Sequence, residues 1–306
     1  MNETLEKQPS PWKSLVLLLL YTFAFSIALQ VAALLLGALT NANMQDFFNS
    51  GGNPSSLGNS RFFMYALLAS STFGTFYLPA VMLQKKEPFQ LYFPAEKTPF
   101  TFYVLAVAFL LVFAPLMNLI GEWNANMNLS ENLKGLENWM REQEDASNAL
   151  IKSIVMVDNF GLLLVNIIVL AVFPAIAEEY YFRGSLLSIF QRLFNNKHLS
   201  IWVTAIIFSA IHVQFFGFVP RMLLGAFFGY MLFWTQNIWV PIIGHFVNNA
   251  SVAIIAYAYT LQGKTFEDLQ SFDSYSIFVY LGSFLLSAAV AVLFYKKSKP
   301  VQTHGE

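Results

Sequence analysis

The sequence predicts an all-α polytopic membrane protein with about eight transmembrane helices. Hydrophobic residues make up 56% of the 306 residues, and charged residues make up only 11%. Soluble domains usually carry about 25% charged residues, so the deficit indicates a chain whose main solvent is lipid. Apolar stretches of about 20 residues, the length needed to cross a bilayer, recur along the chain. We expect residues 1–306 to form a single transmembrane domain within the lipid bilayer.

Eight apolar stretches are candidates for the spans. They cover residues 14–40, 62–84, 98–121, 156–180, 199–216, 220–236, 239–259 and 275–295. We interpret the first as a retained span, because it exceeds the about 7–15 apolar residues of a signal-peptide core. The fourth can continue as helix towards Phe194. Seven spans, or six with a re-entrant segment, are the alternative counts.

The charges of the connections predict the orientation. With eight spans, most Lys and Arg residues lie on the side of the two termini, and the opposite connections are diluted by acidic residues. Cytoplasmic loops carry an excess of Lys and Arg, so both termini are predicted to be cytoplasmic. The long polar connection over 122–152 has apolar residues at helical spacing and is predicted to be an amphipathic helix on the outer surface.

The composition excludes several kinds of chemistry and partner. The chain has no Cys, which rules out disulfides, thiolate nucleophiles and Cys-bound metals. Its 17 basic residues are balanced by 18 acidic ones and form no basic block, so we expect no nucleic-acid partner.

Ionisable residues inside the predicted spans are the strongest functional signal. An ionised side chain at the centre of a span costs about 2.5–3.5 kcal/mol on insertion scales, so each is a functional hypothesis by default. The polar residues in question are Glu178, Glu179, Arg183, His212, His245 and Asn249. Taken singly, the Glu pair could be a helix-end charge pair that reaches water, and each His could be a packing residue with a hydrogen-bond partner.

The spacing of these residues predicts that they meet. Glu179 and Arg183 are four residues apart, as are His245 and Asn249, so each pair shares one face of a helix. The turn at 195–196 lies midway between Glu179 and His212, so an antiparallel hairpin would place the two at equal depth.

A cluster of this kind has two chemical interpretations. A carboxylate beside a neutral imidazole can take a proton from water, while a second His and an Asn amide can donate hydrogen bonds to an oxyanion. Alternatively, two His and one Glu form a known zinc ligand set, for which Glu178, His212 and His245 are the candidates.

Three motifs, in order and within hydrophobic spans, resemble those of a known family. Glu178 to Arg183 match EExxxR, Phe208 to His212 match FxxxH, and His245 to Asn249 match HxxxN. These are the motifs of the CPBP intramembrane proteases, a group that includes the type II CAAX prenyl endopeptidases. The resemblance places the catalytic core at about 156–259.

The resemblance implies an endopeptidase that hydrolyses a peptide bond of a membrane-associated peptide or protein substrate. Glu178 and His212 would activate water, and His245 and Asn249 would stabilise the oxyanion. Glu179 and Arg183 would order the site in a supporting role. The family is commonly labelled metalloprotease, and the sequence leaves both a zinc-bound and a metal-free glutamate mechanism open.

Two hypotheses from other functional classes use the same residues. A proton- or ion-coupled transporter could use the buried carboxylates and histidines, although the sequence shows no internal repeat. A non-catalytic immunity or scaffold protein would tolerate changes at all three motifs.

Overall fold

The computed structural model describes residues 9–39, 49, 61–87 and 97–298. Within this part the chain is almost entirely helical and contains no β-strand. The main helices are α1 (Pro11–Leu39), α3 (Arg61–Thr72), α4 (Leu78–Lys86), α5 (Phe100–Ala125), α6 (Lys134–Val155), α7 (Phe160–Ile167), α8 (Phe173–Glu179), α9 (Leu187–Phe194), α10 (Lys197–Ala210), α11 (Phe218–Thr235), α12 (Trp239–Leu261), α13 (Phe266–Gln270) and α14 (Ile277–Ser298). Short π-helices and 3-10 turns connect several of them: η2 (Phe73–Tyr77), η3 (Glu131–Leu133), η4 (Ile168–Val172), η5 (Tyr180–Leu186) and η6 (Phe215–Gly217).

Among the described residues, 7 helices are long and apolar enough to cross a membrane. They confirm the predicted class, an all-α polytopic membrane protein, and seven of the eight predicted spans. The fourth span continues as one 35-residue helix, Phe160–Phe194, through α7, η4, α8, η5 and α9.

The fifth predicted span, 199–216, is shorter than expected. Helix α10 has 14 residues and ends at Ala210. At about 1.5 Å per residue it is shorter than the roughly 30 Å hydrocarbon core of a bilayer. The apolar residues of this stretch therefore belong partly to α10 and partly to the turn that follows it, over residues 211–217.

Polar side chains from neighbouring helices satisfy the backbone of this turn. The side-chain amide of Asn124 in α5 donates to the Phe215 carbonyl at 3.1 Å and accepts from the Val219 N–H at 2.8 Å. The Phe216 N–H donates to the Glu144 carboxylate of α6 at 3.3 Å. Irregular backbone is tolerated at membrane depth only where protein surrounds it, and these partners provide that environment.

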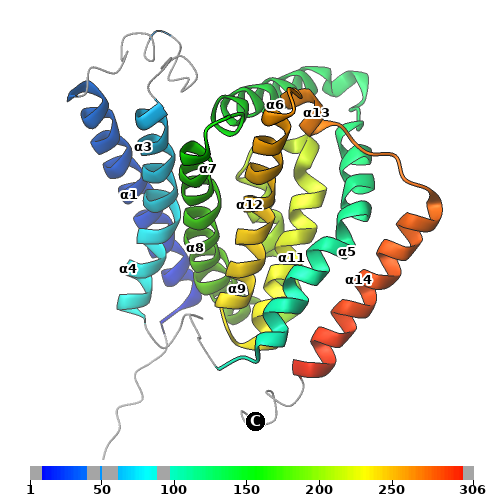
Figure 1. The fold of residues 1–306 in the computed structure, drawn as a ribbon. Helices are drawn as coiled ribbons and strands as arrows, with labels where there is room; N and C mark the ends of the chain where they lie inside the picture. Colours follow the sequence, from blue (N-terminus) through cyan, green and yellow to red (C-terminus); the bar gives the residue numbers. More distant parts are fainter. Residues whose placement is uncertain (1–8, 40–48, 50–60, 88–96, 299–306) are drawn as a thin grey trace, which may run out of the picture.

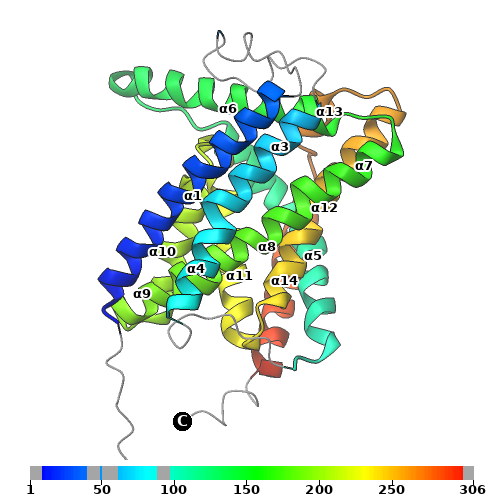
Figure 2. The ribbon, with the colours of Figure 1, turned by 90° about the vertical axis from the view of Figure 1, so that its left-hand side faces the viewer.

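The helices lie roughly side by side, while α6 crosses one end of the bundle (Figures 1 and 2). The Pro11 end of α1 and the Ser298 end of α14 both lie at the opposite end. The polar connection at 122–152 thus contains the predicted helix. One buried residue of α6, Glu137, has its pKa lowered by Arg141 and by the Leu129 N–H, and it joins the helix to the preceding loop.

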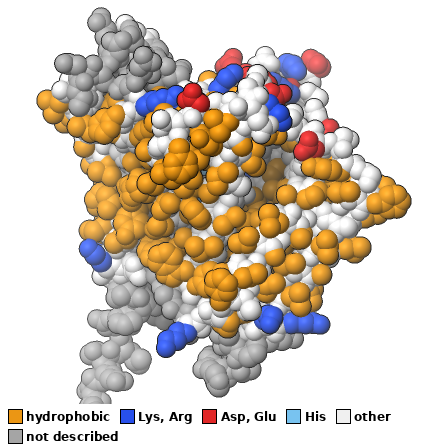
Figure 3. All heavy atoms as spheres, viewed as in Figure 1, with side chains coloured by type: hydrophobic (Ala, Val, Ile, Leu, Met, Phe, Trp, Pro, Cys, Tyr) orange, Lys and Arg blue, Asp and Glu red, His pale blue; other side chains and the backbone are white. Residues whose placement is uncertain are grey.

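A band of hydrophobic side chains covers the face seen in Figure 3, between charged residues at the two ends. Large residues such as Leu20, Phe23 and Leu285 are more than half exposed, as expected for surface that contacts lipid tails. Helix α1 packs through a close approach at Gly74 of η2, where a Cβ would lie 2.7 Å from the Phe25 carbonyl oxygen.

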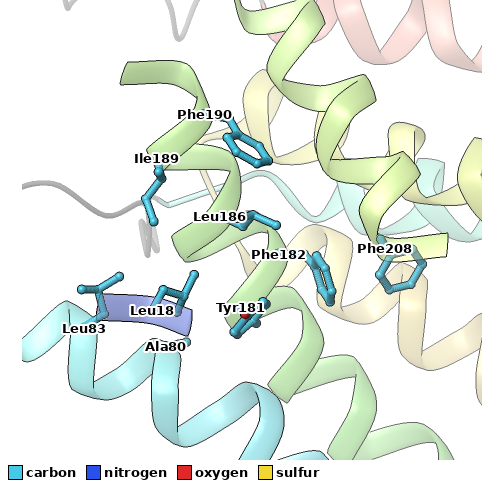
Figure 4. Packing of buried hydrophobic residues seen from close by; sticks show 9 residues of the cluster. All are labelled: Leu18, Ala80, Leu83, Tyr181, Phe182, Leu186, Ile189, Phe190 and Phe208. Atoms are coloured by element: carbon cyan, nitrogen blue, oxygen red, sulfur yellow. The ribbon is translucent and has the colours of Figure 1, made fainter. Parts of the chain in front are cut away.

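The core next to the motifs is formed by α1, α4, η5, α9 and α10 (Figure 4). Its buried residues are Leu18, Ala80, Leu83, Tyr181, Phe182, Leu186, Ile189, Phe190 and Phe208. The two motif segments in this set, η5 and the end of α10, meet where the Phe182 and Phe208 rings pack edge to face at 5.1 Å. The hairpin around residues 195–196 therefore brings the first and second motifs together.

Candidate active site

The first motif lies where a long helix changes its winding. Glu178 and Glu179 end α8, and the next seven residues, including Arg183, form the π-helix η5. Such π-helical turns are rare in proteins, and those that occur often lie at functional sites. The wider turn still places Arg183 beside Glu179.

Glu179 and Arg183 form a buried ion pair, with 2.9 Å between Arg183 Nη1 and Glu179 Oε1. Their side chains are 0% and 1% exposed respectively. Arg183 Nη2 also donates to the Gly225 carbonyl at 2.8 Å, and the guanidinium lies 4.8 Å from the centre of the Phe208 ring. The pair thus joins η5, α10 and α11, so its contacts stabilise the packing of these helices.

His245 connects the third motif to both glutamates. Its Nδ1 lies 2.9 Å from Glu179 Oε1, and its Nε2 lies 3.8 Å from Glu178 Oε2. The ring stacks on Phe228 at 5.5 Å, which fixes its plane. The second nitrogen of His245 therefore faces the carboxylate of Glu178.

Glu178 and His212 line one cavity of about 660 Å³. Glu178 is 8% exposed, and its Oε2 atom has no hydrogen-bond partner within the described residues. Buried polar atoms are nearly always hydrogen-bonded, so the unpartnered oxygen of a carboxylate that lines a cavity is a candidate functional group.

The hydrogen bond of His212 identifies the tautomer of its neutral ring. Nδ1 lies 2.7 Å from the Phe208 carbonyl oxygen, which can only accept. Nδ1 must therefore carry the hydrogen, and in the neutral ring Nε2 keeps its lone pair. The structure thus provides a carboxylate and a basic nitrogen in the same cavity.

Asn249 lies near His245 but outside the residues that line this cavity. Its amide donates to the Leu170 carbonyl at 3.2 Å, and its oxygen accepts from Asn248 at 3.1 Å. One amide hydrogen of Asn249 remains for another acceptor.

The wall of the cavity also contains residues that belong to no recognisable sequence motif. Leu15, Leu19 and Thr22 of α1 form part of its wall, with Ser71 of α3 and Thr75 of η2. Thr22 and Tyr181 hydroxyls lie 3.0 Å apart and connect α1 to η5. Only the packing of α1 and η2 against the motif helices reveals these contributions, because none belongs to a local motif.

The proposed zinc ligands do not form a cluster of three. Among the described residues, no three His, Asp or Glu side chains are gathered in a way that could hold a metal ion. Each histidine uses Nδ1 for a partner within the protein: His245 is bonded to Glu179, and His212 to the Phe208 carbonyl.

Gly225 allows Phe208 and Arg183 to pack closely against α11. A Cβ at this position would lie 3.1 Å from the Phe208 ring and 3.4 Å from Arg183 Nη2. We expect Gly225→Ala to displace Arg183 and to lower the free energy of unfolding by about 1–3 kcal/mol. Unfolding of the purified protein in mixed detergent micelles measures this effect.

The matched control is Gly282→Ala in α14, where nothing lies within 4 Å of the added Cβ. This change should be neutral or stabilising by up to about 1 kcal/mol, because Ala favours helix over Gly. Equal losses in the two variants would contradict the account of Gly225.

Fold and site together define an integral, multi-pass membrane protein with a buried Glu–His cluster at a cavity between its helices. Residues 160–251 match the family described as type II CAAX prenyl endopeptidase Rce1-like. This match confirms the resemblance predicted from the three motifs, all of which lie within it.

The chain is also 30% identical over 111 residues to the uncharacterized protein YpbD of Bacillus subtilis (strain 168). The similarity covers 35% of this chain and 54% of that protein, so the chain spans about half the length of the curated relative it matches. No solved structure matches the chain.

Proposed function

We propose that this chain is an intramembrane endopeptidase that hydrolyses a peptide bond of a membrane-associated substrate. The observation that supports the proposal most strongly is the shared cavity, which Glu178 lines together with His212, whose Nδ1 donates to the Phe208 carbonyl. The family match over 160–251 supports the same reaction class.

The proposed reaction needs only the side chains described above. A water held between Glu178 and His212 Nε2 loses a proton to Glu178 while its oxygen attacks the peptide carbonyl carbon. The carbonyl becomes an oxyanion, which would accept hydrogen bonds from His245 and from the remaining amide hydrogen of Asn249. Because His245 Nδ1 already donates to Glu179, donation from Nε2 as well requires a ring protonated at both nitrogens. The C–N bond then breaks as Glu178 returns its proton to the leaving amine.

Glu179 and Arg183 would support this chemistry indirectly. Glu179 holds His245 through Nδ1, and Arg183 holds Glu179, so the orientation of His245 depends on both. The largely apolar wall of the cavity, with Leu15, Leu19 and Phe190, supports a substrate that reaches the site from within the membrane.

We propose that the reaction proceeds without zinc, since Glu178, His212 and His245 are not gathered as a ligand set. Purified wild-type protein should then contain no stoichiometric zinc by elemental analysis, and cleavage should persist after dialysis against a strong chelator. One zinc per chain that is lost in His212→Ala would contradict this mechanism.

We also propose that both termini are cytoplasmic. The face in Figure 3 supports this orientation, because the charged residues at the end opposite α6 are Lys and Arg, whereas the α6 end carries acidic residues mixed with Lys and Arg. The chain has no Cys, so single cysteines can report on each side.

In intact cells, a membrane-impermeant maleimide should label Glu142→Cys on α6 but not Lys297→Cys at the end of α14. Both positions are exposed, and Lys297→Cys should react after the membrane is permeabilised. The reverse pattern would place the termini outside.

Reconstitution distinguishes the protease from a transporter. Purified protein is placed in liposomes with membrane proteins extracted from cells that lack it, and new peptide termini and internal pH are both followed. We expect new termini without proton or ion flux. Flux without new termini would refute the proposal in favour of transport.

A further inference from the structure

Arg221 is a charged residue within the hydrophobic segment Phe215–Thr235 that the three motifs leave unexplained. A charge inside a span is costly and usually pairs with an opposite charge or with backbone carbonyls. Among the described residues, however, Arg221 forms no ion pair. Its two terminal nitrogens instead bind one neutral residue, Gln214: Nη1 donates to the backbone carbonyl at 3.3 Å and Nη2 to the side-chain oxygen at 2.9 Å.

Gln214 belongs to the turn that carries His212. Between them, Val213 has a φ of 54°, in the left-handed region. A β-branched residue is a genuine outlier there, because its Cβ substituents crowd the backbone. Such conformations persist only where the surrounding structure determines them, and they cluster at functional sites.

The rest of the turn is held from other directions. Asn124 binds Phe215 and Val219, and Glu144 accepts from the Phe216 N–H. These contacts begin after Gln214. Before it, the N–H groups of His212 and Val213 donate to the Ser209 and Ala210 carbonyls at 3.4 and 3.1 Å, while the side-chain contact to Gln214 comes from Arg221. A Cβ at Gly217 would lie 3.3 Å from Arg221 Nη2, which shows how closely the guanidinium fits under the turn.

We propose that Arg221 is a positioning residue that clamps the strained His212–Gln214 turn and thereby holds His212 at the cavity. The effect of Arg221 on catalysis rests on the proposed function, whereas its contact with the turn does not. The bidentate contact to a single residue on the turn favours positioning over direct binding of a substrate anion.

Amide hydrogen exchange tests the clamp without any substrate. In the purified full-length protein, Arg221→Gln should speed exchange in peptides covering 211–217 by about tenfold or more, because opening of the turn becomes easier. The matched control is Arg192→Gln. Arg192 is another partly buried arginine, but it lies on α9, away from this turn, where it binds Ser14 and lies near Glu87. It should leave exchange at 211–217 unchanged.

A second substitution tests the role of strain. Glycine adopts positive φ without steric cost, so Val213→Gly should reduce the dependence on the clamp. The double variant Val213→Gly/Arg221→Gln should therefore exchange more slowly at 211–217 than Arg221→Gln. Unchanged exchange in Arg221→Gln, or no recovery in the double variant, would overturn the proposal.

Cleavage kinetics separate positioning from substrate binding, with a peptide identified from wild-type activity as the probe. Arg221→Gln should lower kcat about 100-fold with little change in KM, and Val213→Gly should restore part of the loss. A raised KM at unchanged kcat would instead indicate a substrate anion site and overturn positioning. If the wild-type protein cleaves nothing, the proposed function fails, whereas the exchange experiment still decides the clamp.

Discussion

Replacement of Glu178 by glutamine is expected to lower kcat for peptide cleavage by about 10²–10⁴-fold, the usual contribution of a general base. Glutamine keeps the size of the side chain but cannot accept the proton of the attacking water. Among the described residues that line the cavity, Glu178 is the only carboxylate, so no other is placed to replace it there. The measurement is the cleavage rate of purified protein in liposomes.

The control for this variant is Glu267→Gln in α13. Glu267 pairs with Lys152 at 2.7 Å, and its side chain is 68% exposed, so its loss should leave the rate unchanged. Full cleavage by purified Glu178→Gln protein would show that another group accepts the proton.

Replacement of Arg183 by methionine is expected to destabilise the fold by about 3–5 kcal/mol, the usual cost of leaving a buried charge without its partner. Methionine keeps much of the volume between Phe208 and Phe228 but removes the guanidinium. Glu179, which is 0% exposed, would then keep only the His245 contact, and the Gly225 carbonyl would lose its side-chain donor. Unfolding in mixed micelles measures the loss.

The double variant Glu179→Gln/Arg183→Met separates charge from packing. It removes both charges, so it should recover most of the stability that Arg183→Met alone loses. If the double variant is as unstable as the single one, packing rather than an unpaired charge causes the loss.

The sequence was sufficient to predict the class of the fold and the residues of the first motif cluster. The i, i+4 spacing of Glu179 and Arg183 predicted their contact, which the structure shows. The turn at 195–196 predicted that Glu179 and His212 lie at equal depth, and in the structure the neighbouring Glu178 lines one cavity with His212. These predictions succeed because helical periodicity and hairpin length are local properties of the chain.

Other parts of the site depend on contacts between distant segments. The hydropathy of 199–216 predicted a full span, because hydropathy carries no information about tertiary contacts. In the structure, Asn124 and Glu144 form hydrogen bonds with the backbone of an irregular turn inside the bundle. The wall supplied by α1, and the contact of Arg221 with Gln214, likewise have no signature in sequence. Both become visible only when the helices are packed.

The central claim is that the Glu178 cavity hydrolyses peptide bonds, and a comparison of protein termini in cells tests it most directly. Membrane fractions from cells with wild-type protein and from cells with Glu178→Ala at equal abundance are analysed by mass spectrometry of termini. We expect at least one new terminus in a membrane-associated protein that is present with the wild type and absent with Glu178→Ala. Identical sets of termini in the two cells, with both proteins inserted in the membrane, would contradict the account.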